Sequence, residues 1–153
     1  MKILALDSSG LVASVAVVEN DTLLAEHTVN YKKTHSQTLL PMLDEISNMT
    51  ELDLSTIDAI AVAGGPGSFT GLRIGSATAK GLGLALEKPL ISIPTTAAIA
   101  YNIWDTNKFV CPIMDARRNQ VYTGVYCYTD HRLDTVWEQD TMSIEALAEG
   151  LNC

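Results

Sequence analysis

The sequence predicts an α/β domain, in which helices pack on a sheet that begins at the N-terminus. Three observations support this class: a short apolar run at residues 3–6, two further strand-like segments directly after it, and a long apolar segment at about 70–86 that follows a glycine-rich turn. Apolar residues make up 47% of the 153 residues, which is ample for a core. This length corresponds to one domain, or to one domain and the beginning of another.

The first three strands are expected at residues 2–7, 12–18 and 22–29, as an antiparallel meander. Ser8-Ser9-Gly10 and Asn20-Asp21 supply the turns between them. Thr34 to Gln37 matches a capping box, with Thr34 as the N-cap and Gln37 three positions later, so a helix is expected from there to about residue 48. Pro41 lies inside this predicted helix and should remove one backbone hydrogen bond and bend it.

A fourth strand is expected at about 57–63, followed by the glycine turn and a helix at about 70–86. Pro89 ends that helix, a short strand covers 90–93, and a helical stretch runs from Pro94 to about Trp104. The composition changes near residues 105–107. Strands are then expected at 109–114, 121–128 and about 133–138, with a loop at 115–118, and Ser143 should cap a final helix. We therefore expect an N-terminal domain over 1–104 and the start of a truncated second domain over 105–153.

Charge and cysteine content narrow the function classes. The formal net charge is −8, whereas a chain that binds RNA by itself normally carries a basic face, so contact with RNA is expected only through a partner. The three cysteines are odd in number and have no C-x-x-C spacing, which indicates neither a disulfide framework nor a zinc site and fits the reducing cytosol. No signal peptide or membrane span is expected, so the predicted location is cytoplasmic.

The segment at 70–86 carries a small residue at every fourth position: Gly71, Gly75, Ala79 and Gly83. This spacing places them on one helix face, where another backbone can approach closely. The remaining residues are apolar almost all round, which is typical of a helix buried on both sides. The sheet would cover one side of this helix. The neighbouring predicted helix alone could cover the other side, but we expect another chain to contribute. The predicted partner interface consists of Leu39, Leu43, Ile46, Leu72, Gly75, Ala79, Leu82 and Gly83.

Two turns could bind an anion. Asp7, Ser8 and Ser9 lie between two strands, where small hydroxyl residues can surround a phosphate and a carboxylate can hold a hydrated metal ion; an ordinary Asx turn is the alternative. Asp115 and Arg117 hold a comparable position in the second half. Gly64-Gly65-Pro66-Gly67 precedes a helix but lacks the spacing and the lysine of a Walker A loop, so a sharp strand-to-helix turn is the simpler explanation.

Other catalytic patterns are missing from the sequence. The three histidines are scattered, and neither H-x-x-x-H nor H-E-x-x-H occurs, so no metal site is predicted. Ser68 lacks the second glycine of a nucleophile elbow and has no nearby base, which argues against a peptidase. No catalytic residue is predicted.

Residues 65–75, GPGSFTGLRIG, together with Ile3 to Ser9 and His35-Ser36-Gln37, resemble the TsaB (YeaZ) family over about residues 1–130. The resemblance implies an actin-like, sugar-kinase-like ATPase fold (the ASKHA, ribonuclease H-like class) with a mixed five-stranded sheet. It also implies a non-catalytic scaffold in the biosynthesis of threonylcarbamoyladenosine in tRNA. Such a scaffold uses the two helices of its N-terminal domain to pair with itself when alone and with a homologous catalytic subunit (TsaD). The assembly then recruits an ATPase (TsaE).

The catalytic relative carries an H-x-x-x-H metal site where the resemblance places Thr95 and Ile99 of this chain. No cofactor is therefore expected to be required, although ATP or ADP could bind at the interface with the partner, near Asp7, Ser8 and Ser9. The alternative function is an ATP-binding phosphotransferase or ATPase of the same fold class, which would use Asp7 and the serine turn.

Overall fold

The structure is a computed structural model that describes residues 1–31 and 35–152. The described residues divide into two compact units, Met1–Ile93 and Pro94–Cys153. The predicted boundary at 104/105 lies later in the chain. The segment in between belongs with the second unit because Ala100 packs on Val110 and Tyr126, and the Thr96 hydroxyl is hydrogen-bonded to the Tyr126 hydroxyl at 2.7 Å.

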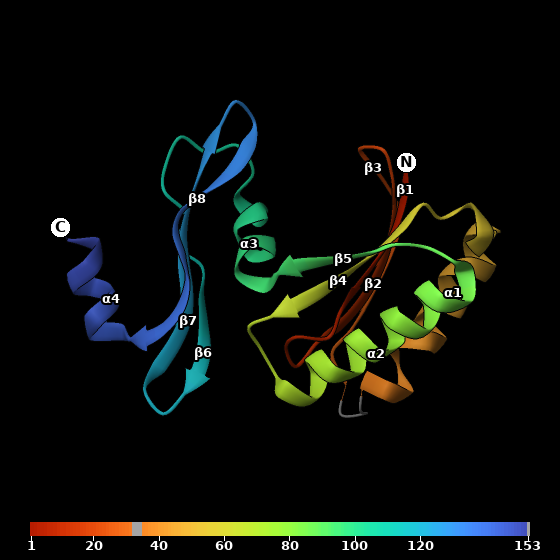
Figure 1. Cartoon of the computed structure of the whole chain (residues 1–153), viewed down its shortest axis with the longest axis horizontal. Helices are drawn as coiled ribbons and strands as arrows, with labels where there is room; N and C mark the ends of the chain where they lie inside the picture. Colours follow the sequence, from red (N-terminus) through yellow and green to blue (C-terminus); the bar gives the residue numbers. More distant parts are fainter. Residues whose placement is uncertain (32–34, 153) are drawn as a thin grey trace. The chain divides into compact units, whose positions relative to one another are not determined.

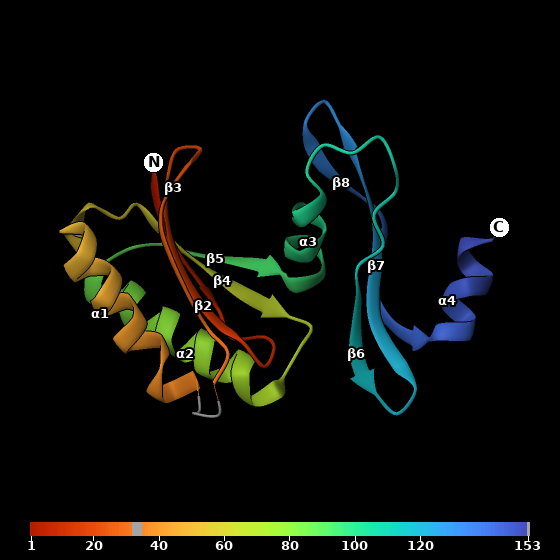
Figure 2. The ribbon, with the colours of Figure 1, turned by 180° about the vertical axis from the view of Figure 1, so that it is seen from behind.

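The first unit is built on a five-stranded sheet with the order β3-β2-β1-β4-β5 (Figures 1 and 2). Its strands are β1 (Lys2–Asp7), β2 (Ala13–Glu19), β3 (Thr22–Val29), β4 (Ala59–Gly65) and β5 (Leu90–Pro94). β1 pairs antiparallel with β2 and parallel with β4, and β2 pairs antiparallel with β3. The predicted mixed five-stranded sheet is confirmed, and each of its strands begins within two residues of the expected position.

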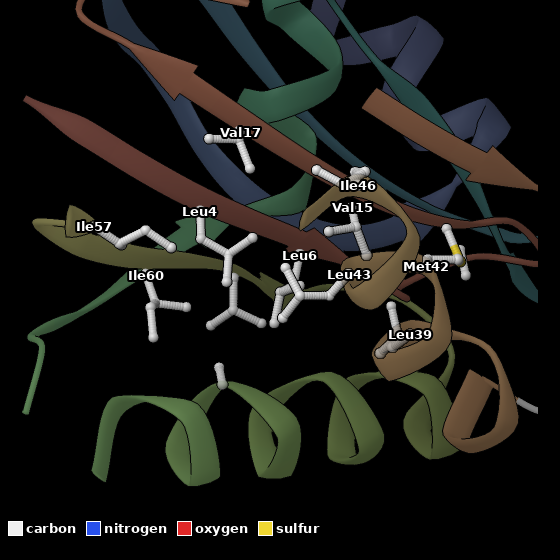
Figure 3. Close-up of a cluster of buried hydrophobic side chains, with 13 residues drawn as sticks. Leu4, Leu6, Val15, Val17, Leu39, Met42, Leu43, Ile46, Ile57 and Ile60 are labelled. Carbon is white, nitrogen blue, oxygen red and sulfur yellow. The ribbon is translucent and has the colours of Figure 1, made fainter. Parts of the chain in front are cut away.

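Two helices, α1 (Leu39–Thr50) and α2 (Phe69–Leu86), pack on the same face of this sheet. α1 contacts β2 and β3, and α2 contacts β4 and β1. The core lies between the helices and the sheet: Figure 3 shows side chains of β1, β2 and α1 pointing into this layer. Alternation along β1 and β2 fills it, because every second residue there is buried. The thirteen buried residues of this core are Leu4, Leu6, Ala13, Val15, Val17, Leu39, Met42, Leu43, Ile46, Ile57, Ile60, Val62 and Ala79.

The start of α1 differs from the prediction. The residues His35–Gln37 form a separate turn of 3-10 helix, and α1 begins at Leu39 with Thr38 as its N-cap. The predicted N-cap Thr34 lies outside the described residues. Pro41 is the third residue of α1, where its missing N–H would have had no partner within the helix, so no bond is lost; the first such bond runs from Met42 N to Thr38 O.

The second unit contains α3 (Thr95–Ala100), a three-stranded sheet in the order β6-β7-β8, and α4 (Ile144–Leu151). The strands are β6 (Ile113–Arg117), β7 (Gln120–Thr129) and β8 (Arg132–Ser143). β6 begins four residues later than predicted and includes most of the predicted loop. Ser143 caps α4 as expected, because its hydroxyl accepts the Ala146 N–H at 3.1 Å. Two short 3-10 helices, Leu54–Thr56 and Tyr101–Ile103, complete the elements. Among the described residues, no helix has the length and apolar character needed to cross a membrane.

Candidate functional site

The turn after β1 is an Asx turn. Asp7 ends the strand, and its Oδ1 accepts the backbone N–H of Ser9 at 2.7 Å. Ser8 and Ser9 are only 2% and 4% exposed, although they lie in a turn between two strands. Of the two interpretations that the sequence left open here, the Asx turn is the one observed. Its burial is the feature that the local sequence did not predict.

The glycine-rich segment at 64–71 covers this turn. The Ser8 hydroxyl donates to the backbone oxygen of Gly71 at 2.9 Å, and the Ser68 N–H donates to the backbone oxygen of Ser9 at 2.6 Å. A Cβ atom on Gly71 would overlap the Ser8 carbonyl, and a Cβ on Gly67 would overlap the Ser9 carbonyl. Only glycine lets the two backbones approach this closely.

His35 joins the same cluster from the segment before α1. Its Nε2–H donates to the backbone oxygen of Gly10 at 3.0 Å, and its ring lies 3.3 Å from where a Cβ on Gly71 would stand. The three segments that carry the family resemblance therefore meet at one point. We call these contacts, made by Asp7–Gly10, His35 and Gly67–Gly71, the hairpin–helix cluster.

Two of the donors that a phosphate could use in this cluster are already engaged. A phosphate would need free N–H and O–H donors, but the Ser8 hydroxyl and the Ser9 N–H already donate within the unit. The serines are also buried beneath the start of α2. These contacts give Asp7, Ser8 and Ser9 a structural role, which is to connect the first hairpin to α2. The degenerate phosphate loop predicted at these residues stays a prediction.

Ser68 has a structural position as well. It is the N-cap of α2, and its side-chain oxygen accepts the N–H of Gly71 at 3.3 Å. Serine is among the preferred N-cap residues because it satisfies one of the helix's unpaired N–H groups. This role accounts for the serine in the GPGSFTG segment without any nucleophile.

The small-residue face of α2 is closed by its own unit. Gly71, Gly75, Ala79 and Gly83 are all buried. A Cβ on Gly75 would overlap the Ser8 hydroxyl, and a Cβ on Gly83 would lie 2.8 Å from the side chain of Leu90. The close approach that this face permits is therefore to the sheet of its own unit. The partner interface predicted at these residues stays a prediction, and their burial is an argument for seeking the contact elsewhere on α2.

Most of the other predicted interface residues are also covered by their own unit. Leu39, Leu43 and Ile46 lie in the core, each at most 4% exposed, and Leu82 packs against that core. Leu72 stays half-buried and borders the outer surface of α2. A four-residue period identifies one side of a helix, but it does not say whether a sheet or another chain covers it.

The outer face of α2 is the surface that the sequence did not single out. Its exposed positions include Phe69, Arg73, Ala77, Lys80 and Leu84, with Phe69 74% and Leu84 84% exposed. Positions two apart in a helix point in nearly opposite directions, so this set lies opposite the glycine face. The Arg73 guanidinium lies over the Phe69 ring, 5.3 Å from its centre. A shallow depression along this face is bordered by Leu72 and Ser76 as well.

Titratable groups elsewhere form pairs rather than clusters. His27 lies 3.1 Å from Glu45, and His131 lies 2.7 Å from Asp105. Within residues 1–31 and 35–152, no three His, Cys, Asp or Glu side chains are grouped in a way that could hold a metal ion.

Outside the hairpin–helix cluster, two described side chains have a shifted pKa. Hydrogen bonds from Ser55 lower the pKa of Asp53, the N-cap of the short helix before β4. Burial raises the pKa of Tyr128, which makes edge contacts with the rings of Tyr101 and Trp104. Neither group belongs to a chemical site.

Comparison with known proteins gives consistent results. A family model described as "TsaD: tRNA N6-adenosine threonylcarbamoyltransferase" matches residues 22–152. The TsaB protein of Bacillus subtilis, named for tRNA threonylcarbamoyladenosine biosynthesis, is 38% identical over 136 residues, which is 89% of this chain and 59% of the relative. The Escherichia coli TsaB protein is also 38% identical, over 82% of this chain and 55% of its own length.

A solved structure shows the same fold. YeaZ from Pseudomonas aeruginosa superposes with a TM-score of 0.83 at 32% identity, covering 94% of this chain and 68% of that one. The predicted fold class is confirmed by this match and by the sheet order. This chain spans between half and three fifths of the length of the curated relatives named above.

Proposed function

Because this chain belongs to the TsaB (YeaZ) family, we propose that it is a non-catalytic scaffold subunit in the biosynthesis of threonylcarbamoyladenosine in tRNA. In this proposal it pairs with a TsaD-like catalytic homologue that places threonylcarbamoyl on N6 of the adenosine next to the anticodon. A TsaE-like ATPase joins the assembly, tRNA is contacted only through the complex, and the protein is a homodimer when alone. Its place of action is the cytoplasm, where tRNA is modified.

The exposed outer face of α2 is the observation that carries the proposal. Phe69 and Leu84 lie almost fully in solvent at opposite ends of an 18-residue helix whose other side is already covered. Large apolar side chains bordered by charged ones are typical of a protein–protein interface. The partner is therefore expected to meet Phe69, Leu72, Arg73, Lys80 and Leu84, rather than the buried residues that the sequence suggested.

The exposed surface of α1 can extend this interface. α1 packs beside α2 on the same sheet face, and Leu40 and Met49 are exposed on it. Asp44 and Glu45 of α1 carry negative charge, whereas the charges of α2 are Arg73 and Lys80. A homologous partner that crosses the two helices would place opposite charges against each other, which favours correct docking.

Two further observations favour a scaffold over an enzyme. Thr95 and Ile99 stand on α3 where the resemblance places the two histidines of the catalytic relative, and neither side chain is a histidine-like metal ligand. In the turn at Asp7, the Ser8 hydroxyl and the Ser9 N–H already donate within the unit. Both observations weigh against the alternative of an independent ATPase or phosphotransferase.

The test is co-purification of this chain with a TsaD-like homologue, followed by measurement of threonylcarbamoyladenosine in tRNA. Leu84→Asp should weaken the association at least about tenfold, because it places a charge in the apolar interface. Leu11→Asp is the matched control: Leu11 is 88% exposed in the β1–β2 turn and should leave association unchanged. Equal association of both variants would remove α2 as the docking face. Micromolar binding and turnover of Mg-ATP by this chain alone would instead support the ATPase.

A further inference from the structure

A second candidate docking surface lies at the opposite edge of the sheet from β5, along β3. β3 is the last strand of the order β3-β2-β1-β4-β5, so only one of its two sides is paired with a described strand. An edge strand of this kind presents a row of N–H and C=O groups that an extended chain can pair with. The strand is eight residues long, which is enough for several such bonds.

A groove runs beside this edge. It is formed by four consecutive residues of β3 (24–27) and by four residues of α1, and its volume is about 380 Å³. Leu24 and Met49 supply exposed apolar surface at its border, at 42% and 79% exposure. Leu24 is the extra residue of a bulge, because Val17 pairs with Ala25 while Val18 pairs with Leu23.

β3 also lacks most of the devices that keep edge strands from pairing. Its sequence, TLLAEHTV, contains no lysine, arginine or proline, which are the residues that usually block an edge. The bulge at Leu24 and the charge of Glu26 are the two features of β3 that can hinder edge pairing. Leu23 adds an apolar side chain that is 55% exposed.

The charges beside the groove favour a basic partner. Glu26 and Glu45 are among the lining residues of the groove, which include no lysine or arginine. The carboxylate of Glu45 lies at the groove, whereas that of Glu26 lies on the other face of the same edge, so each face of the edge carries one negative charge. Glu45 faces His27 at 3.1 Å and is 57% exposed. Glu26 is on the opposite face of the sheet from His27, where it accepts the Thr28 hydroxyl at 2.7 Å and remains exposed.

We propose that the edge of β3 and the groove between β3 and α1 bind an extended peptide segment of another protein by strand addition, with basic and apolar residues alternating in that segment. A strand added about 4.8 Å from β3 sends every second side chain to each face. The peptide side chains beside Ala25 and His27 enter the groove near Met49, where apolar side chains of the peptide would be buried. Those beside Glu26 lie on the other face, where a lysine or arginine forms a cross-strand ion pair.

A second copy of this chain fits the surface less well. If two β3 strands paired with each other, each would bring Glu26 and no lysine or arginine of its own to the contact. Two copies also each carry a net charge of −8. Like charges across a strand pair are destabilising, so a basic segment from a different protein is the better complement.

The experiment uses a capped peptide of about seven residues with alternating valine and lysine, and a control peptide with glutamate in place of lysine. Amide chemical shifts of this chain should change at 22–29 and 45–50, and the lysine peptide should bind at least about tenfold more tightly than the glutamate peptide. Equal binding of the two peptides, or shift changes elsewhere, would overturn the proposal.

Variants of this chain locate the contact. Glu26→Lys and Met49→Lys change exposed side chains, so folding should be retained, and each should weaken the lysine peptide about tenfold or more. Glu138→Lys makes the same charge change on β8 and should leave the affinity as it was. Unchanged binding to Glu26→Lys would contradict strand addition. If sedimentation shows a dimer that Glu26→Lys alters while no peptide binds, the occupant is a second copy and the proposal is wrong.

Discussion

The two units each contain the same turn, in different surroundings. In the first, Asp7 Oδ1 accepts the Ser9 N–H at 2.7 Å, and in the second, Asp115 Oδ1 accepts the Arg117 N–H at 2.7 Å. The first turn is buried under the start of α2, whereas Asp115 and Arg117 are exposed. In both units, an aspartate at or near the end of a strand forms the turn. The glycine-rich segment that buries the first turn lies about 60 residues further along the chain.

The largest effect should come from filling the contact that buries the first turn. Gly71→Ala places a Cβ against the Ser8 carbonyl, which neither backbone can avoid without moving α2, so we expect a loss of about 2–4 kcal/mol. Hydrogen exchange of the β1 amides measures this loss for the first unit.

Gly81→Ala is the matched control for Gly71→Ala. Gly81 is in the same helix with nothing within 4 Å of its added Cβ, so alanine should stabilise α2 by about 0.5–1 kcal/mol. Equal protection of β1 in the two variants would mean that the hairpin–helix cluster does not hold the unit together.

The next effect separates the two aspartates. Asp7→Ala leaves the buried Ser9 N–H without its acceptor and should cost about 1–3 kcal/mol. Asp115→Ala should cost less than about 0.5 kcal/mol, because the exposed Arg117 N–H can bond to water instead. Hydrogen exchange of the β1 amides measures the stability of the first unit, and exchange of the β7 amides measures that of the second. Similar losses of stability in Asp7→Ala and Asp115→Ala would contradict the idea that burial makes the first turn more important.

A smaller effect is expected from exchanging the residue after each aspartate. Ser8→Ala gives the first turn the Asp-Ala sequence of the second and removes the bond to Gly71, at a cost of about 1 kcal/mol. The reverse change, Ala116→Ser, should alter the second unit by less than about 0.5 kcal/mol. Urea unfolding followed at the two units checks both, and a loss from Ala116→Ser larger than that from Ser8→Ala would refute the comparison.

The smallest effect concerns Tyr128 in the second unit. Its hydroxyl is buried without a hydrogen-bond partner among the described residues, so Tyr128→Phe should raise stability by up to about 1 kcal/mol. Burial raises the pKa of Tyr128 in the folded state. The neutral phenol is therefore favoured by folding, and the free energy of unfolding falls as the pH rises from the pKa of the unfolded state through that of the folded state. Absorbance titration should show one tyrosine that ionises at higher pH than a free tyrosine, and Tyr128→Phe should remove it.

The sequence predicted the elements better than their surroundings. The apolar pattern of residues 12–18, the proline at residue 89 and the cap at Ser143 act locally, and the strand and helices there agree with the structure. The side of α2 that meets the sheet depended on contacts with Ser8, which is 63 residues from Gly71 in the sequence. For the same reason, the meeting of His35 with Gly10 could not be foreseen from either segment alone.

α2 carries only positive charge on a chain that is negative overall. No aspartate or glutamate occurs in its 18 residues, and Arg73 and Lys80 are both exposed there on a chain of net charge −8. In the assembly proposed above, this positive charge favours an acidic surface on the partner and would speed the encounter between the two proteins. Added salt should then slow the encounter while leaving the lifetime of the finished complex nearly unchanged.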